Sequence, residues 1–155
     1  MRCCSGIGRR SGRRTGRGGR FAESARDSAA LALHQPRADD PIGVLSAVGG
    51  FEIATMTGFM IGASAARLPV VVDGFIASSA ALVALALAPE IRGALFFAHC
   101  SAEKAHRVML DQLNANPILH LDMRLGEGSA SAIAVNLIEC AVKLYRQMAT
   151  FQDLH

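Results

Sequence analysis

The sequence predicts an α/β protein with a parallel sheet, because of its composition and two short buried-strand patterns. Hydrophobic residues make up 51% of the 155 residues and aromatic residues only 5%. The apolar mass is therefore aliphatic, as in buried parallel strands covered by Ala-rich helices. Residues 68–72 (LPVVV) and 94–98 (ALFFA) are continuous apolar runs of strand length. Helical patterns lie before, between and after them, which favours parallel pairing.

Five helices are expected around these strands, each bounded by capping or turn residues. Asp40 and Pro41 are typical of a helix start, and Gly49 with Gly50 of its end. Ser101 is the expected N-cap of the helix that follows the second strand. The predicted helices cover residues 39–50, 51–67, 74–88, 101–114 and 130–148.

Two strands make only part of a doubly wound sheet, which usually has about five or six. Residues 118–124 are ambiguous in pattern and add no clear strand. The predicted fold class is therefore α/β, with a partial doubly wound parallel sheet and flanking Ala-rich helices. The high apolar fraction excludes disorder as a description of the whole chain.

The first 28 residues differ in composition from the rest. Residues 1–20 hold seven arginines, six glycines and no acid, so the formal charge of +3 arises there and the remainder is mildly acidic. We interpret residues 1–28 as an unstructured or mistranslated extension and residues 29–155 as the folded part. Arg/Gly segments also bind nucleic acids, but residues 1–20 contain no aromatic side chain for base stacking. We therefore expect no nucleic-acid partner.

The cysteines and the apolar segments indicate a cytoplasmic protein without a membrane anchor. The four cysteines (Cys3, Cys4, Cys100 and Cys140) form neither a CxxC motif nor a regular framework, which favours free thiols in a reducing compartment. The longest apolar stretch, residues 74–88, is too short to cross a hydrocarbon core of about 30 Å.

A glycine-flanked acid is the sharpest local motif. Leu125, Gly126, Glu127, Gly128 and Ser129 form a loop that opens the last helix. A helix N-terminus is a ready seat for a phosphate, and an acid beside it could act as a general base. The alternative is a glycine-rich helix start with Glu127 facing water, since short glycine motifs recur by chance.

Polar residues also follow both predicted strands, where open α/β sheets bind their ligands. Asp73 and Gly74 follow the first strand, and His99 and Ser101 follow the second. The alternative role of Asp73 is to cap the next helix. A metal site built from His99, Cys100, Glu103 and His106 is disfavoured, because the spacing is not a usual zinc pattern.

Several long segments, taken together, resemble nicotinate-nucleotide–dimethylbenzimidazole phosphoribosyltransferases, which make the lower-ligand nucleotide of cobalamin. The matching segments are VLSAVGGFEIATMTGFMIGA (44–63), LPVVVDGFIASSAAL (68–82), HCSAEK (99–104) and MRLGEGS (123–129). Their order and spacing also match, over roughly residues 29–151.

The resemblance implies a pentosyltransferase that moves phosphoribose from nicotinate mononucleotide to 5,6-dimethylbenzimidazole, without a cofactor or metal. It implies that Glu127 is the catalytic base, held in an apolar pocket. By the same matching, substrate binding is expected at Asp73, Gly74, Ser101, Leu125, Gly126, Gly128 and Ser129. Family members assemble as homodimers, so a homodimer is the implied state of the full-length protein.

The chain also departs from the family pattern. Ala130 stands where the family has a glycine, which adds a Cβ near the expected phosphate seat. The N-terminal half of the family fold has no counterpart here. A truncated, non-catalytic remnant or a phosphate-binding interaction module is therefore the alternative function.

Overall fold

The computed structural model describes residues 27–123 and 126–149. The chain divides into two compact units, residues 1–36 and 37–155. In the first unit, the described part is a helix over residues 27–34 with a short extension. Most of the predicted Arg/Gly extension lies outside the described residues, so its state stays a prediction.

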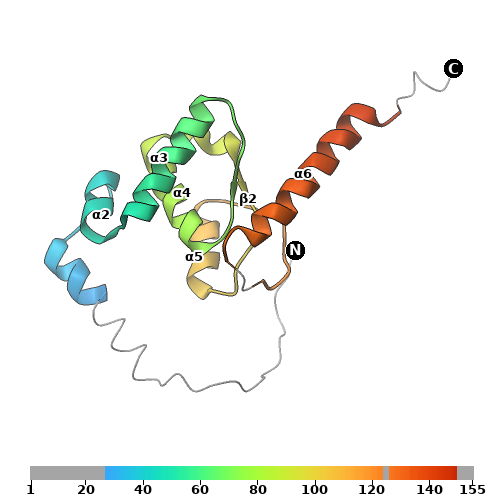
Figure 1. Ribbon diagram of the computed structural model, residues 1–155. Helices are drawn as coiled ribbons and strands as arrows, with labels where there is room; N and C mark the ends of the chain where they lie inside the picture. The colour runs from blue at the N-terminus through green and yellow to red at the C-terminus, as the bar shows by residue number, and fades with distance from the viewer. Residues whose placement is uncertain (1–26, 124–125, 150–155) are drawn as a thin grey trace, which may run out of the picture. The chain divides into compact units, whose positions relative to one another are not determined.

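The second unit contains the predicted alternation of helices and strands (Figure 1). Its elements are α2 (Pro41–Val48), α3 (Phe51–Ala65), β1 (Val70–Val72), α4 (Phe75–Leu87), the 3-10 helix η1 (Pro89–Ala94), β2 (Leu95–Phe97), α5 (Lys104–Gln112) and α6 (Ser129–Gln147). None of the helices in the described part of the chain is long and apolar enough to cross a bilayer.

Local signals define α2 as the sequence predicts. The Asp40 carboxylate accepts a hydrogen bond from the Gly43 backbone N–H at 2.9 Å, while Pro41 occupies the first turn. Gly49 follows the last helical residue and donates its N–H to the Leu45 carbonyl. The helix therefore ends at the predicted glycine pair.

The two strands are parallel neighbours, which confirms the predicted fold class. Val70, Val71 and Val72 align with Leu95, Phe96 and Phe97, and α4 with η1 forms the crossover between them. Parallel strands require such a crossover, because a short hairpin reverses the chain direction and produces antiparallel strands.

The ambiguous segment 118–124 adds a single β-bridge to this sheet. Leu119 pairs in parallel with His99, and its N–H donates to the Ala98 carbonyl at 2.8 Å. The N–H of Ile118 donates to the Phe97 carbonyl at 2.9 Å. Residue 119 thus extends the sheet next to the end of β2, where the site lies.

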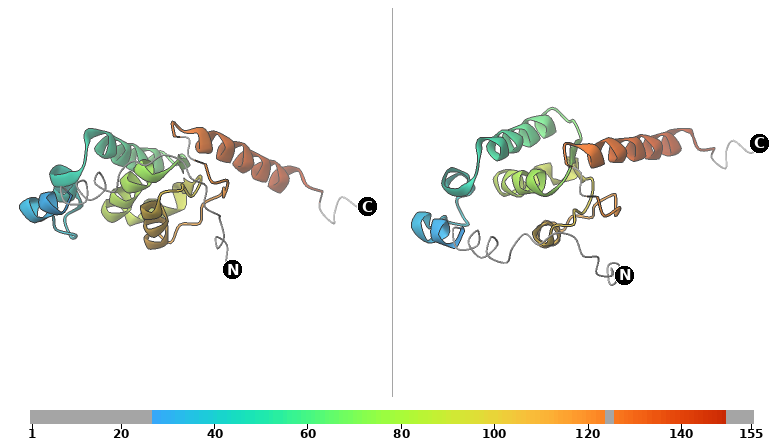
Figure 2. Two further views of the ribbon diagram at one scale, coloured as in Figure 1. Left: turned by 90° about the horizontal axis from the view of Figure 1, so that it is seen from below. Right: turned by 60° about the horizontal axis from the view of Figure 1, so that its bottom comes forward.

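Small side chains allow α4 to pack closely against α3 and the sheet. Ala80, Ala81 and Ala84 are fully buried, and Met60 of α3 joins the same apolar cluster. Figure 2 shows α3 and α4 side by side in both views. The predicted Ala-rich flanking helices are therefore confirmed.

A second, smaller cluster joins α6 to the sheet. Ala130 and Ala134 of the first turns of α6 pack with Ala98 and Leu119, and all four are buried. The first turns of α6 are thereby held beside the ends of both strands. This contact places the glycine-flanked acid at the sheet edge.

Candidate functional site

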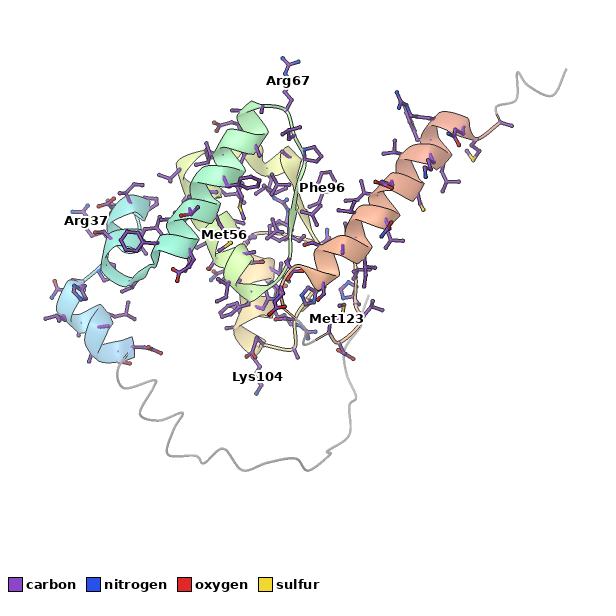
Figure 3. The ribbon with its side chains drawn as sticks, in the orientation of Figure 1. Arg37, Met56, Arg67, Phe96, Lys104 and Met123 are labelled. Carbon is purple, nitrogen blue, oxygen red and sulfur yellow. The ribbon has the colours of Figure 1, made fainter. Side chains whose placement is uncertain are left out.

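A cleft of about 790 Å³ lies beyond the carboxyl ends of β1 and β2. Its wall combines residues 73–77 after β1, His99 and residues 101–103 after β2, and residues 126–128 before α6. Met56 from α3 and Met123 from the loop before α6 complete the lining (Figure 3). This is the edge where ligands bind to open α/β sheets.

Most of the residues predicted for substrate binding meet at this cleft. Asp73, Gly74, Ser101, Gly126 and Gly128 line it together with the predicted base Glu127. Ser129 is not part of the lining, and its hydroxyl donates to the Gly126 carbonyl at 2.9 Å. Leu125 lies outside the described residues, so its role stays a prediction.

Some lining residues carry no sequence signal of their own. Met56 falls within the quoted segment 44–63, but nothing in that helix pattern marks it as a residue of the cleft. Phe75 directly follows Asp73 and Gly74, which were predicted at the end of the first strand. Applying the same strand-end rule to one more residue would have predicted Phe75 in the cleft. Met123 falls within the quoted segment MRLGEGS.

The acid-bearing loop turns sharply into α6. Glu127 has a φ of 62° and Gly128 a φ of 79°, so two successive residues adopt left-handed conformations. Glycine tolerates this conformation, whereas a glutamate there is uncommon and strained. Such strain is often found at functional sites. The Glu127 side chain is exposed, so the expected enclosure of this carboxylate is not met in the described part of the chain.

Asp73 caps a different helix from the one expected. The N-cap of α4 is Gly74, and no side chain bonds there. Instead, Oδ1 of Asp73 accepts hydrogen bonds from the N–H (3.0 Å) and hydroxyl (3.3 Å) of Ser131, in the first turn of α6. The carboxylate therefore occupies part of the helix terminus where the sequence suggested a phosphate seat.

Ala130 is accommodated without entering the cleft. Its side chain is fully buried in the small cluster with Ala98 and Ala134. The Cβ that replaces the family glycine therefore packs against the sheet and away from the cleft lining.

Ser101 bonds to a buried histidine and does not cap a helix. The following helix, α5, begins at Lys104 with Glu103 as its N-cap, so the predicted cap was wrong. The N–H of Ser101 donates to Nδ1 of His106 at 3.0 Å, and its Oγ lies 2.9 Å from the same nitrogen. Without Ser101, the buried Nδ1 of His106 would lack a hydrogen-bond partner, whereas Nε2 has Ser78.

Burial lowers the pKa of His106, the proximity of His99 lowers it further, and Asp73 opposes both effects. The ring of His99 lies 6.2 Å from that of His106 in an edge-on arrangement, and its own Nδ1 is buried without a partner. No group of three potential ligands in the described ranges is placed to hold a metal ion.

The described cleft wall is acidic. It presents the carboxyl groups of Asp73, Glu103 and Glu127, and none of its described residues is lysine or arginine. A wall of this kind favours neutral or positively charged groups over a phosphate.

The low pKa of His106 predicts acid sensitivity of the fold. The unfolded chain binds a proton at this ring near pH 6.5 more readily than the folded chain does. The stability that the neutral His106 ring provides to the folded state is therefore complete above that pH. It is lost as the pH falls through the lower pKa of the folded state. We expect the free energy of unfolding to fall by at most about 1.4 kcal/mol per pH unit from this group. Urea denaturation between about pH 5 and 7.5 measures it, and His106→Asn should show a shallower dependence. Equal slopes would contradict the assignment.

The parallel strands and the cleft at their carboxyl ends define an α/β protein that binds a small molecule at the edge of its sheet. The family match specifies the class further. The chain matches the family model described as Phosphoribosyltransferase over residues 23–154. It belongs to this family.

Named relatives narrow the family to one kind of transferase. The chain is 55% identical over 122 residues to a nicotinate-nucleotide–dimethylbenzimidazole phosphoribosyltransferase from Pelodictyon phaeoclathratiforme, covering 79% of this chain and 34% of the relative. It is 55% identical over 125 residues to the enzyme of the same name from Geobacter sulfurreducens, covering 81% and 36%. The crystal structure of CobT from Thermus thermophilus superposes with a TM-score of 0.82 at 36% identity, covering 90% of this chain and 41% of that one. The resemblance predicted from the sequence is confirmed, and the chain spans about a third of the length of these curated relatives.

Proposed function

We propose that this chain serves the transfer of phosphoribose from nicotinate mononucleotide to 5,6-dimethylbenzimidazole, giving α-ribazole 5′-phosphate and nicotinate. The observation that carries the proposal is Glu127, which stands in a left-handed turn and lines a cleft at the ends of both strands. The names of the relatives supply the substrates, and the cleft supplies a base and a wall that suit them.

The proposed step breaks one carbon–nitrogen bond and forms another. One ring nitrogen of dimethylbenzimidazole attacks the anomeric carbon, while the bond from that carbon to the nicotinate nitrogen breaks. The electron pair of the broken bond neutralises the positive pyridinium ring, so nicotinate leaves easily. The proton on the second benzimidazole nitrogen passes to the Glu127 carboxylate, which acts as general base.

The acidic wall assists this step through its charge. As the bond breaks, positive charge leaves the departing ring and passes to the anomeric carbon and then to the attacking benzimidazole ring. Carboxylates of Asp73, Glu103 and Glu127 on one wall stabilise such charge. Water is excluded from the exposed Glu127 when the benzimidazole itself binds, which strengthens the contact.

The alternative is a non-catalytic remnant that keeps part of the fold. The observation that favours it is the exposure of Glu127, because the enclosure expected of a catalytic base is not met. A phosphate-binding module is less well supported, because Asp73 already bonds to the first turn of α6 and the described wall has no lysine or arginine.

The remaining assignments follow from the proposed reaction. The partners are small molecules, and we propose a homodimer for the full-length protein. The setting we propose is the cytoplasm, because Cys100 and Cys140 are free thiols. Size-exclusion chromatography with light scattering tests the oligomeric state.

An assay for the product tests the proposal. The purified chain is incubated with nicotinate mononucleotide and dimethylbenzimidazole, and both products are followed by liquid chromatography and mass spectrometry. We expect nicotinate and α-ribazole 5′-phosphate to appear in equal amounts and only when both substrates are present. Binding of the substrates without any product would instead favour the non-catalytic alternative.

A further inference from the structure

A buried hydrogen-bonded series connects the cleft wall to the core. Ser101 lines the cleft and bonds to Nδ1 of His106, whose Nε2 lies 3.0 Å from Oγ of Ser78 on α4. His106 is completely buried and Ser78 is 1% exposed. Side chains in such a series have little freedom to reorient, because each polar atom would lose its partner.

The backbone of Ser101 determines where the His106 proton lies. A backbone N–H can only donate, and that of Ser101 points at Nδ1 from 3.0 Å. Nδ1 must therefore carry a lone pair, which leaves the ring proton on Nε2, where it is donated to the Ser78 hydroxyl oxygen. The charged groups nearest the ring, His99 and Asp73, act in opposite directions, and burial favours the neutral ring.

This tautomer determines the direction of the Ser101 hydroxyl. Oγ of Ser101 lies 2.9 Å from Nδ1, whose one in-plane lone pair can be shared by the backbone N–H and the hydroxyl hydrogen of this serine, whereas two unprotonated acceptors this close would repel each other. The hydroxyl hydrogen therefore points at His106. The oxygen then offers only lone pairs to the cleft, beside the three carboxyl groups of the same wall.

We propose that His106 is a positioning residue that holds Ser101 as a hydrogen-bond acceptor, so that this wall binds the donor groups of the substrates and leaves the phosphate elsewhere. The ligand chemistry is a neutral N–H or O–H donor, supplied by ribose hydroxyls or by the benzimidazole ring, whose one N–H would then be shared between Ser101 and Glu127. The identity of these ligands rests on the proposed function, whereas the orientation of Ser101 does not.

The ligand-free chain tests the hydrogen-bond arrangement. Nitrogen NMR of the His106 ring is expected to show an unprotonated Nδ1 and a protonated Nε2 near neutral pH. A proton on Nδ1 would overturn the proposal, whatever the chain does with substrates.

Two amide variants, each of which replaces one of the two ring nitrogens, separate positioning from simple stability. His106→Asn keeps an acceptor near the position of Nδ1 and loses the donor to Ser78, whereas His106→Gln keeps a donor near Nε2 and loses the acceptor for Ser101. Each variant leaves one buried partner unsatisfied, so both should lose similar amounts of stability. The Kd is measured for 5,6-dimethylbenzimidazole and for nicotinate riboside, and whichever of them Ser101 contacts is informative. We expect that Kd to stay within about twofold in the Asn variant and to rise about fivefold in the Gln variant. Equal changes in both variants would reduce His106 to a structural role.

Four probes identify the group that Ser101 meets. They are 5,6-dimethylbenzimidazole, its N-methylated form without the N–H, nicotinate riboside without a phosphate, and inorganic phosphate, each titrated by NMR. We expect Ser101→Ala to weaken the binding of dimethylbenzimidazole or of the riboside about fivefold and to leave the binding of phosphate unchanged. If the ring N–H is the donor, the N-methylated form binds equally well to the original chain and to Ser101→Ala. If a ribose hydroxyl is the donor, the riboside is the probe whose binding is weakened in Ser101→Ala.

The outcomes distinguish this inference from the proposed function. If Ser101→Ala weakened the binding of phosphate and of no other probe, the inference would be overturned. An active chain in which Ser101→Ala changes neither affinity nor KM would also overturn it, while leaving the proposed transfer intact. Absence of both product and binding of any probe would overturn the transfer and the ligand assignment together.

Discussion

Glu127→Gln is expected to lower the rate of α-ribazole 5′-phosphate formation by about 10²- to 10⁴-fold, the usual contribution of a positioned general base. Glutamine preserves the size and the hydrogen-bonding oxygen of the side chain but cannot accept the benzimidazole proton at neutral pH. The left-handed turn and the glycine that follows stay unchanged. The loss should therefore fall on kcat, with KM for both substrates nearly constant.

Glu103→Gln provides the matched control. Glu103 is a second exposed carboxylate of the same wall, and its substitution removes the same charge. We expect it to lower the rate by less than about tenfold, because Glu103 contributes a charge to the wall and accepts no proton in the proposed step. Similar losses in both variants would show that Glu127 contributes charge alone, and equal rates in Glu127→Gln and the original chain would remove it from the mechanism.

Phe97→Ala should cost about 3–5 kcal/mol of unfolding free energy, the largest stability effect we expect from one side chain. Phe97 is 3% exposed, lies in β2 opposite Val72, and packs in the main apolar cluster. The guanidinium of Arg92 lies 5.4 Å from the centre of its ring. Truncation would leave a cavity next to the strand that carries His99 and Ser101 to the cleft.

Phe96→Ala tests the same strand on its other face. Phe96 is 37% exposed, so its truncation removes less buried surface and creates no enclosed cavity (Figure 3). We expect a loss of about 1 kcal/mol or less. Urea denaturation followed by circular dichroism measures both variants. Comparable losses would mean that the two faces of β2 are buried to a similar degree in solution.

The local elements could be predicted because their signals are local. The cap at Asp40, the apolar runs of both strands and the Ala-rich pattern of α4 each depend on neighbouring residues only. The single bridge at Leu119 could not be predicted in this way. One residue pairing with a strand end leaves no alternation or apolar run in the sequence.

The partners of the site residues were harder to predict than their positions. The strand-end rule placed Asp73 and Ser101 at the cleft, but the cap expected at Ser101 was wrong, and the alternative role of Asp73 as the cap of α4 is not observed. Asp73 bonds to Ser131, 58 residues further along the chain, and Ser101 bonds to a histidine that the core has buried. Hydrogen bonds of this kind depend on how helices dock, which sequence spacing does not describe.

Residue order alone established the family, the order of the elements and the acid between two glycines, because these depend on runs of neighbouring side chains. Only the folded arrangement decided that Asp73 bonds to the first turn of α6, that Ala130 packs inward, and that Ser101 bonds to the buried His106. The physical reason is that a buried polar group must find a partner, and the nearest partner in space is often distant along the chain.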